Sequence, residues 1–125
     1  MLTIALELDN HLLTYVHYVR IKERRAVRML FDWDESKRQT NLAKHLVDFQ
    51  EATQIFDGPV FEKARRRHGE DRVLAIGLME DVEIVVVYVM RGKRRRIISA
   101  RRAHRDEKKD YANHLRDTGK GSHGF

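Results

Sequence analysis

The stretch VEIVVVYVMRGKRRRIISA, residues 82–100, decides the fold. Residues 82–90 are apolar at odd and even positions alike, which predicts a central β-strand covered on both faces. The glycine in RGK (91–93) predicts a tight turn, after which RRRIISA (94–100) pairs back as the second strand of a hairpin. The two isoleucines indicate a buried face, whereas the arginines need water, a carboxylate or a phosphate.

The arginine-rich strand raises the question of which side chains share a face. Alternation along a strand places Ser99 with Arg101 on one face, and Arg96 with Ile98 and Ala100 on the other. A β-bulge near Ser99 would change this assignment. Between residues 91 and 102 there are seven Lys or Arg residues and no acid, which indicates a polyanion or an acidic protein as partner. The alternative is a solvent-exposed sheet edge, where the charged side chains prevent the strand from pairing with other protein chains.

Two helices are predicted before the hairpin. Asp34 follows a short apolar strand and can cap a helix that runs to His45, with Leu42 and Leu46 as its sparse apolar stripe. The second helix begins at about Phe49, where aromatic residues recur at helical spacing. Because almost no linker separates the two helices, they are expected to cross at a steep angle.

A third helix is predicted at residues 104–115, with Glu107 and Tyr111 on one face because they are four residues apart. Strands are predicted at residues 30–33, 59–64, 72–77, 82–90 and 94–100, with a polar turn at 65–71. This order predicts an α+β fold, in which a small antiparallel β-sheet carries two N-terminal helices and one C-terminal helix.

The length of 125 residues fits one compact domain. Residues 1–28 differ in character from the rest, and we interpret them as an N-terminal extension; the alternative is an extra strand at the sheet edge. Residues 29–116 are then the compact domain, and residues 117–125 a flexible tail. There is no cysteine, no signal-peptide pattern and no apolar stretch long enough for a membrane span. We therefore expect a cytoplasmic protein without membrane contact.

Few classes of catalytic site fit this sequence. The seven histidines are scattered, without cysteine or paired carboxylates beside them, so a metal site is not expected. Neither a GxGxxG nor a GxSxG motif occurs, which argues against a nucleotide cofactor and against acyl transfer. No cofactor is therefore predicted. What remains is a basic strand with a few titratable groups near it.

Several short motifs occur in a defined order: FDWD (31–34), NxxKH (41–45), VxFxEA (47–52), IG (76–77), VVVY (85–88), RIISARRA (96–103) and ExxxY (107–111). Residues 30–111 thereby resemble the BrnT family, the toxins of one class of type II toxin–antitoxin modules. The resemblance implies a RelE-like ribonuclease fold and a metal-independent endoribonuclease that inhibits translation. It also implies a BrnA-like antitoxin with a ribbon-helix-helix part, a heterotetrameric complex, operon autorepression and operator DNA bound only through the antitoxin.

The resemblance also implies a set of functional residues. The catalytic candidates are Lys44, His45, Arg72, Arg96, Ser99, Arg101 and Glu107. Arg96 and Arg101 are expected to bind phosphate and stabilise the transition state, because a guanidinium group can hold two phosphate oxygens. Lys44 or His45 is expected to transfer protons, with Glu107 as the alternative. The candidates for further RNA contacts are Arg94, Arg95, Arg102 and Trp33, although a tryptophan is more often part of a core.

The sequence departs from the BrnT pattern at Leu46, where family members have glycine after the KH pair. Glycine would end the helix in a left-handed conformation, which costs another residue about 1 kcal/mol. Either the turn differs here, or burial of Leu46 offsets the cost. Two other functions stay open: a non-catalytic basic module that binds nucleic acid or an acidic partner, and an inactive toxin that acts as a co-repressor.

Overall fold

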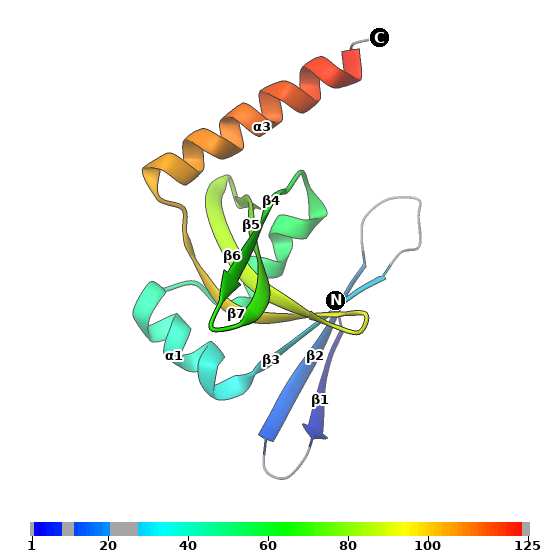
Figure 1. Cartoon of the computed structure of the whole chain (residues 1–125). Coiled ribbons are helices and arrows are strands. Elements are labelled where there is room, and N and C mark those ends of the chain that lie inside the picture. The colour runs from blue at the N-terminus through cyan, green and yellow to red at the C-terminus, as the bar shows by residue number, and fades with distance from the viewer. Residues whose placement is uncertain (1, 9–11, 21–27, 124–125) are drawn as a thin grey trace.

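The computed structural model describes the backbone of residues 2–8, 12–20 and 28–123 and the side chains of residues 30–118. Its centre is a seven-stranded sheet in the order β1-β2-β3-β7-β6-β5-β4. The arrangement of strands and helices is shown in Figure 1. The strands are β1 (Leu2–Leu8), β2 (Leu12–Arg20), β3 (Arg28–Asp34), β4 (Phe61–Arg67), β5 (Glu70–Met79), β6 (Val82–Arg91) and β7 (Arg94–Arg102).

The sheet is mixed, so the prediction of an antiparallel sheet is wrong at one junction. Strand β3 pairs with β7 in parallel, with Leu30 opposite Arg94 and Asp32 opposite Arg96. The other neighbours are antiparallel, as expected for β4–β5, β5–β6 and β6–β7, which are joined by two-residue turns. Strands β1 and β2 extend the sheet beyond β3, which matches the alternative of added edge strands. The boundary of the compact domain at residue 29 stays a prediction.

The helices cover both faces of the sheet. Helix α1 (Glu35–His45), α2 (Phe49–Ala52) and the 3₁₀ helix η1 (Thr53–Asp57) lie between β3 and β4 in the chain, and α3 (Arg105–His123) follows β7. Asp34 caps α1 as predicted, because its carboxylate accepts the N–H groups of Ser36 and Lys37. Helix α3 runs beyond the predicted end at residue 115, and its second half projects from the sheet (Figure 1).

The core has two parts, one on each face of the sheet. The first is built from β3, α2, η1 and alternate residues of β5–β7, and includes Phe31, Phe49 and Ile55. The second lies under α3 and is closed by Tyr111, which is 2% exposed. Strand β6 contributes Val86 to the first part and Val85 and other residues to the second. The prediction that this strand is central and covered on both faces is confirmed.

Glycine at position 77 allows η1 to approach β5 closely. A Cβ atom on Gly77 would lie 2.7 Å from the Cβ atom of Ile55, a separation that forces the backbone or the side chain to shift. Ile55 is fully buried there. The IG pair at residues 76–77 therefore has a packing role, since any larger residue would push η1 away from the sheet.

The segment predicted as a polar turn, residues 65–71, is mostly strand. Strand β4 continues to Arg67, and only His68 and Gly69 form the turn before β5 begins at Glu70. Gly69 has a φ of 72° and His68 a φ of 52°, a combination typical of a two-residue hairpin turn. The three arginines of this segment therefore alternate between the two faces of an edge strand.

Candidate functional site

A β-bulge in β7 decides which of its side chains share a face. Val87 lies opposite Ser99 and Tyr88 opposite Ile97, so Ile98 is the extra residue. On either side of the bulge, Val89 lies opposite Arg96 and Val85 opposite Arg101.

Directly opposed residues of antiparallel strands point to the same face. The bulge therefore places Arg96, Ser99 and Arg101 together, on the face covered by α3. The prediction from simple alternation, which put Arg96 on the opposite face from Ser99 and Arg101, is therefore wrong. The alternative of a β-bulge near Ser99 is confirmed.

The first of two neighbouring pockets lies between α1 and β7, and we call it the α1 pocket. Its volume is about 270 Å³. Lys44 and His45 line it from the helix, and Ile98 and Ser99 from the strand. The two candidates for proton transfer therefore border the same space as the candidate serine.

Asn41 fixes α1 against β7 at this point. Its side-chain amide donates to the backbone oxygens of Ala100, at 2.8 Å, and of Val47, at 3.0 Å. Its side-chain oxygen accepts the backbone N–H of Ala100, at 3.2 Å. Asn41 thus bonds the free edge of β7 as a neighbouring strand would, and it brings His45 beside Ser99.

Asn41 is the buried residue of α1, at 7% exposure, whereas Leu42 and Leu46 are exposed. The prediction that the two leucines form the buried stripe of the helix is therefore wrong. The sequence signal for this contact was the asparagine of the NxxKH motif. A buried asparagine needs hydrogen-bonding partners, which the backbone of β7 supplies here.

The second pocket lies on the other side of Ser99, and we call it the arginine pocket. Its volume is also about 270 Å³, and Val87 and Ser99 line it together with four arginines. These are Arg65 and Arg67 of β4, Arg72 of β5 and Arg101 of β7. Ser99 is common to both pockets, so the two adjoin along the bulge of β7.

Two of these residues, Arg65 and Arg67, were not predicted as functional. The sequence signal was the run RRR at residues 65–67, which we assigned to a turn. In the structure the alternation of β4 directs them to the same face as Arg72, because Arg65 lies directly opposite that residue.

Arg101 is held by Glu107 in a two-pronged ion pair. Its Nη1 and Nη2 atoms lie 2.8 Å and 2.9 Å from the two carboxylate oxygens. The same carboxylate accepts the backbone N–H of His104 and thereby helps to begin α3. The bond to Arg101 is the largest of the effects that lower the pKa of Glu107 to about 2. Glu107 is therefore a fixed negative charge that positions Arg101, and this weakens its candidacy as a proton carrier.

His45 has a pKa below its usual value of 6.5. Burial is the largest cause, and the positive charges of Lys44 and Arg101 add to it. The imidazole is therefore neutral at pH 7 and has a nitrogen lone pair that can accept a proton.

The remaining predicted residues lie outside the two pockets. Arg94 and Arg96 both bind the carboxylate of Asp32, which is 3% exposed, at 3.4 Å and 3.5 Å. Arg96 is therefore paired with a buried carboxylate, and its expected contact with phosphate stays a prediction. Arg95 packs over the rings of Phe56 and Tyr88, with its guanidinium carbon 4.8 Å and 5.3 Å from their centres.

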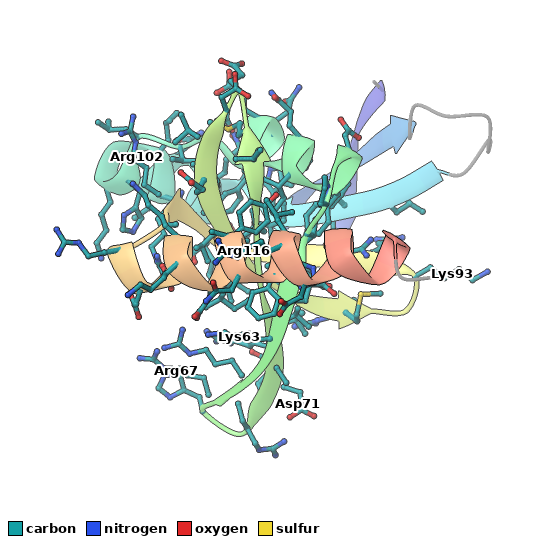
Figure 2. The ribbon with its side chains drawn as sticks, turned by 90° about the horizontal axis from the view of Figure 1, so that it is seen from above. Lys63, Arg67, Asp71, Lys93, Arg102 and Arg116 are labelled. Atoms are coloured by element: carbon teal, nitrogen blue, oxygen red, sulfur yellow. The ribbon has the colours of Figure 1, made fainter. Side chains whose placement is uncertain are left out.

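Arg102 and Trp33 complete the set of predicted RNA contacts. Arg102 is exposed and lies opposite Ile84, on the other face of the sheet from Ser99 and Arg101. Lys93 and Arg102, near the two ends of β7, lie at opposite sides of the molecule in Figure 2. Trp33 is 1% exposed and packs edge-on against Phe49. Its ring belongs to the core and offers no surface on which a base could stack.

Leu46 ends α1 in the left-handed conformation, with φ 61° and ψ 27°, and its side chain is 81% exposed. Neither of the two expected alternatives applies. The turn keeps the left-handed conformation that suits glycine, and the exposed leucine side chain gains no burial that would offset the cost of that conformation. We expect Leu46→Gly to raise the free energy of unfolding by about 1 kcal/mol. Urea denaturation measures this change, and an equal loss of stability would contradict the assignment of strain at this residue.

A family model described as the ribonuclease toxin BrnT of type II toxin–antitoxin systems matches residues 33–107. The chain belongs to this family. The match spans α1, both pockets and the Arg101–Glu107 pair, so the predicted resemblance to BrnT is confirmed. Membership implies a ribonuclease toxin with an RNA substrate and an antitoxin partner. A comparison with curated proteins gives no match.

The residues that the family model matches include all those that line the two pockets. Among the described residues, no group of three or more His, Asp or Glu side chains is arranged to hold a metal ion. Within the same part of the chain, no helix is long and apolar enough to cross a bilayer.

Proposed function

We propose that this BrnT protein is a metal-independent endoribonuclease that cuts RNA at the junction of the two pockets. The observation that carries the proposal is the position of Ser99, which borders a histidine with a lowered pKa on one side and a group of arginines on the other. This arrangement supports both proton transfer and charge stabilisation at one phosphodiester.

Cleavage of RNA without a metal has three requirements. A base takes the proton of the 2′-hydroxyl, an acid gives a proton to the leaving 5′-oxygen, and cations stabilise the negative charge that develops on the phosphorus oxygens. His45 is the proposed base because its imidazole is neutral at pH 7. Lys44 is the proposed acid, since its ammonium group borders the same pocket.

The cationic role falls to Arg101 and Arg72. Both side chains border the arginine pocket, and Glu107 and Glu70 hold them by ion pairs of 2.8 Å and 3.2 Å. A guanidinium group that is already immobilised loses little freedom when it binds a phosphate. Ser99 lies between the base and the arginines, where its hydroxyl can donate to a phosphate oxygen or to the attacking 2′-oxygen.

The remaining features of the proposal rest on the family. They are a RelE-like fold, inhibition of translation in the cytoplasm, and neutralisation by a BrnA-like ribbon-helix-helix antitoxin. The complex is proposed to be a heterotetramer that represses its own operon and reaches operator DNA through the antitoxin alone. The net charge of +6 and the exposed arginines support binding of an acidic partner or of RNA.

Incubation of the purified protein with end-labelled RNA in EDTA tests the proposal. We expect cleaved products that end in a 2′,3′-cyclic phosphate, formed equally well with and without the chelator. A substrate that carries 2′-deoxy residues throughout is expected to stay intact. If the RNA remains whole at high protein excess, both alone and with ribosomes added, the protein is instead a non-catalytic binding module or an inactive toxin that acts as co-repressor.

A further inference from the structure

Strand β4 carries two arginines, Arg65 and Arg67, with which no described acid pairs. It forms the edge of the sheet beyond β5, and six of its seven residues are exposed. Arg65 and Arg67 point to the arginine pocket, whereas Arg66 points to the opposite face. In Figure 2, Arg67 and Asp71 lie on opposite sides of the β4–β5 hairpin.

The charge balance differs between the two faces of this edge strand. Arg66 forms an ion pair with Asp71 at 2.5 Å, so its charge is compensated. In the arginine pocket, Arg72 pairs with Glu70 and Arg101 with Glu107. Within the part of the chain whose side chains are described, neither Arg65 nor Arg67 has an acidic partner, so the pocket keeps a surplus of positive charge.

Protection of an edge strand by charge is the competing explanation. Arginine on an exposed strand prevents pairing with other chains whichever face it occupies. That role does not require two arginines in one pocket, and it does not require Arg65 directly opposite Arg72. Like charges opposite each other destabilise a sheet. The cost is compensated when an anion lies between them.

We propose that Arg65 and Arg67 bind a backbone phosphate next to the one that is cut. This inference rests on the proposed function, because it places the scissile phosphate at Ser99 and Arg101. The substrate is then a single-stranded RNA that runs from the α1 pocket across Ser99 to the outer end of β4. Arginine suits such a subsite because its planar fork binds phosphate oxygens in pairs and stays charged at any physiological pH.

The subsite explains how the protein distinguishes a long RNA from a short RNA fragment. A dinucleotide has one phosphate and fills the site at Ser99, whereas a longer RNA also places a phosphate between Arg65 and Arg67. Binding energy from this distant contact favours long substrates at a given concentration without taking part in proton transfer. The two arginines are therefore binding residues and not catalytic ones.

The test compares Arg65→Gln/Arg67→Gln with Arg66→Gln, a matched control on the same strand. Each variant is titrated, by fluorescence anisotropy, into a twelve-nucleotide RNA whose 2′-hydroxyls are all methylated, so that it cannot be cut. The titrations are repeated at several salt concentrations. Cleavage of an unmodified twelve-nucleotide RNA and of a dinucleotide is measured in parallel, and circular dichroism shows that each variant is folded.

We expect the double variant to bind the twelve-nucleotide RNA about tenfold more weakly. The slope of log K against log salt should fall by about 0.7, the value for one phosphate contact on a single strand. The loss of kcat/KM should be at least threefold greater for the long RNA than for the dinucleotide, and should lie mainly in KM. Arg66→Gln should match the wild type in each measurement.

Two results would overturn the inference. One is a double variant that binds the methylated RNA as Arg66→Gln does, with the same salt slope. The other is an equal loss of kcat/KM on both substrates, which would place the two arginines at the reacting phosphate itself. If the wild type cut neither RNA, the proposed function would fail, and the anisotropy data would still decide whether β4 holds a phosphate.

Discussion

Replacement of Arg101 by glutamine is expected to lower the kcat of RNA cleavage by about 10²–10³-fold, the usual effect of removing one preorganised donor to a developing charge. Arg101 borders the pocket that contains Ser99 and carries the only positive charge there that a two-pronged carboxylate pair immobilises among the described residues. Single-turnover cleavage of labelled RNA measures the effect, and growth of cells that express the variant reports it independently.

The loss must be separated from a loss of folding. Arg101→Gln leaves the Glu107 carboxylate with the backbone N–H of His104 but without its arginine, and loss of a charge-assisted pair to a partly buried carboxylate costs about 1–3 kcal/mol of stability. The double variant Arg101→Gln/Glu107→Gln avoids this unpaired charge and should be folded yet inactive. Arg101→Lys keeps the positive charge but loses the planar guanidinium group that can hold two phosphate oxygens. Its activity should therefore lie between those of Arg101→Gln and the wild type. Growth arrest as strong as that of the wild type in the double variant would remove Arg101 from the site.

The same ion pair gives the wild type a specific response to acid. The pKa of Glu107 is about 2 in the folded state, below its usual value of 4.5. A depressed carboxyl pKa means that the unfolded chain binds the proton more readily, so this stabilisation is complete above about pH 4.5 and is lost as the pH falls toward 2. The double variant lacks both partners, and its unfolding should lose this part of the pH dependence.

Much of the fold followed from the sequence because local patterns and tertiary structure agree. The hairpin of β6 and β7, the cap at Asp34 and the helix that contains Tyr111 all have short-range signals. The parallel pairing of β3 with β7 has none, since it joins residues more than sixty positions apart. Nothing in the pattern of either strand specifies which neighbour it takes.

The candidate site was predictable only in part. The KH pair and the serine were candidates by resemblance alone, and the structure places Lys44, His45 and Ser99 around one pocket. Arg96 was indistinguishable from Arg101 by residue type. In the structure Arg96 pairs with Asp32 of the neighbouring strand, whereas Arg101 pairs with Glu107 and borders the arginine pocket. Arg65 and Arg67 were assigned to a turn, because a run of polar residues before glycine resembles a loop when the length of the strand is unknown.

Substitution of His45 is the second large effect that we expect. If His45 is the base, His45→Ala lowers kcat by about 10²–10⁴-fold, the contribution of a positioned general base. The side chain is half-buried at the C-terminal end of α1, and burial is the largest cause of its lowered pKa. Because Asn41 and not His45 anchors the helix to β7, the variant should stay folded, which circular dichroism and urea denaturation can verify.

The pH profile distinguishes this role from mere packing. The pKa of His45 is lowered in the folded protein, mainly by burial, so a rate that depends on neutral imidazole rises with pH and levels off above that lowered pKa. Removing the nearby charge by Lys44→Gln raises the pKa of His45, because less repulsion opposes protonation. The acid limb of the profile should therefore move to higher pH in this variant, on a lower overall rate because Lys44 is also the proposed acid, and the residual activity of His45→Ala should lack that limb. A profile with the same acid limb in all three proteins would show that another group takes the proton, and the geometry of the α1 pocket would then have a binding role alone.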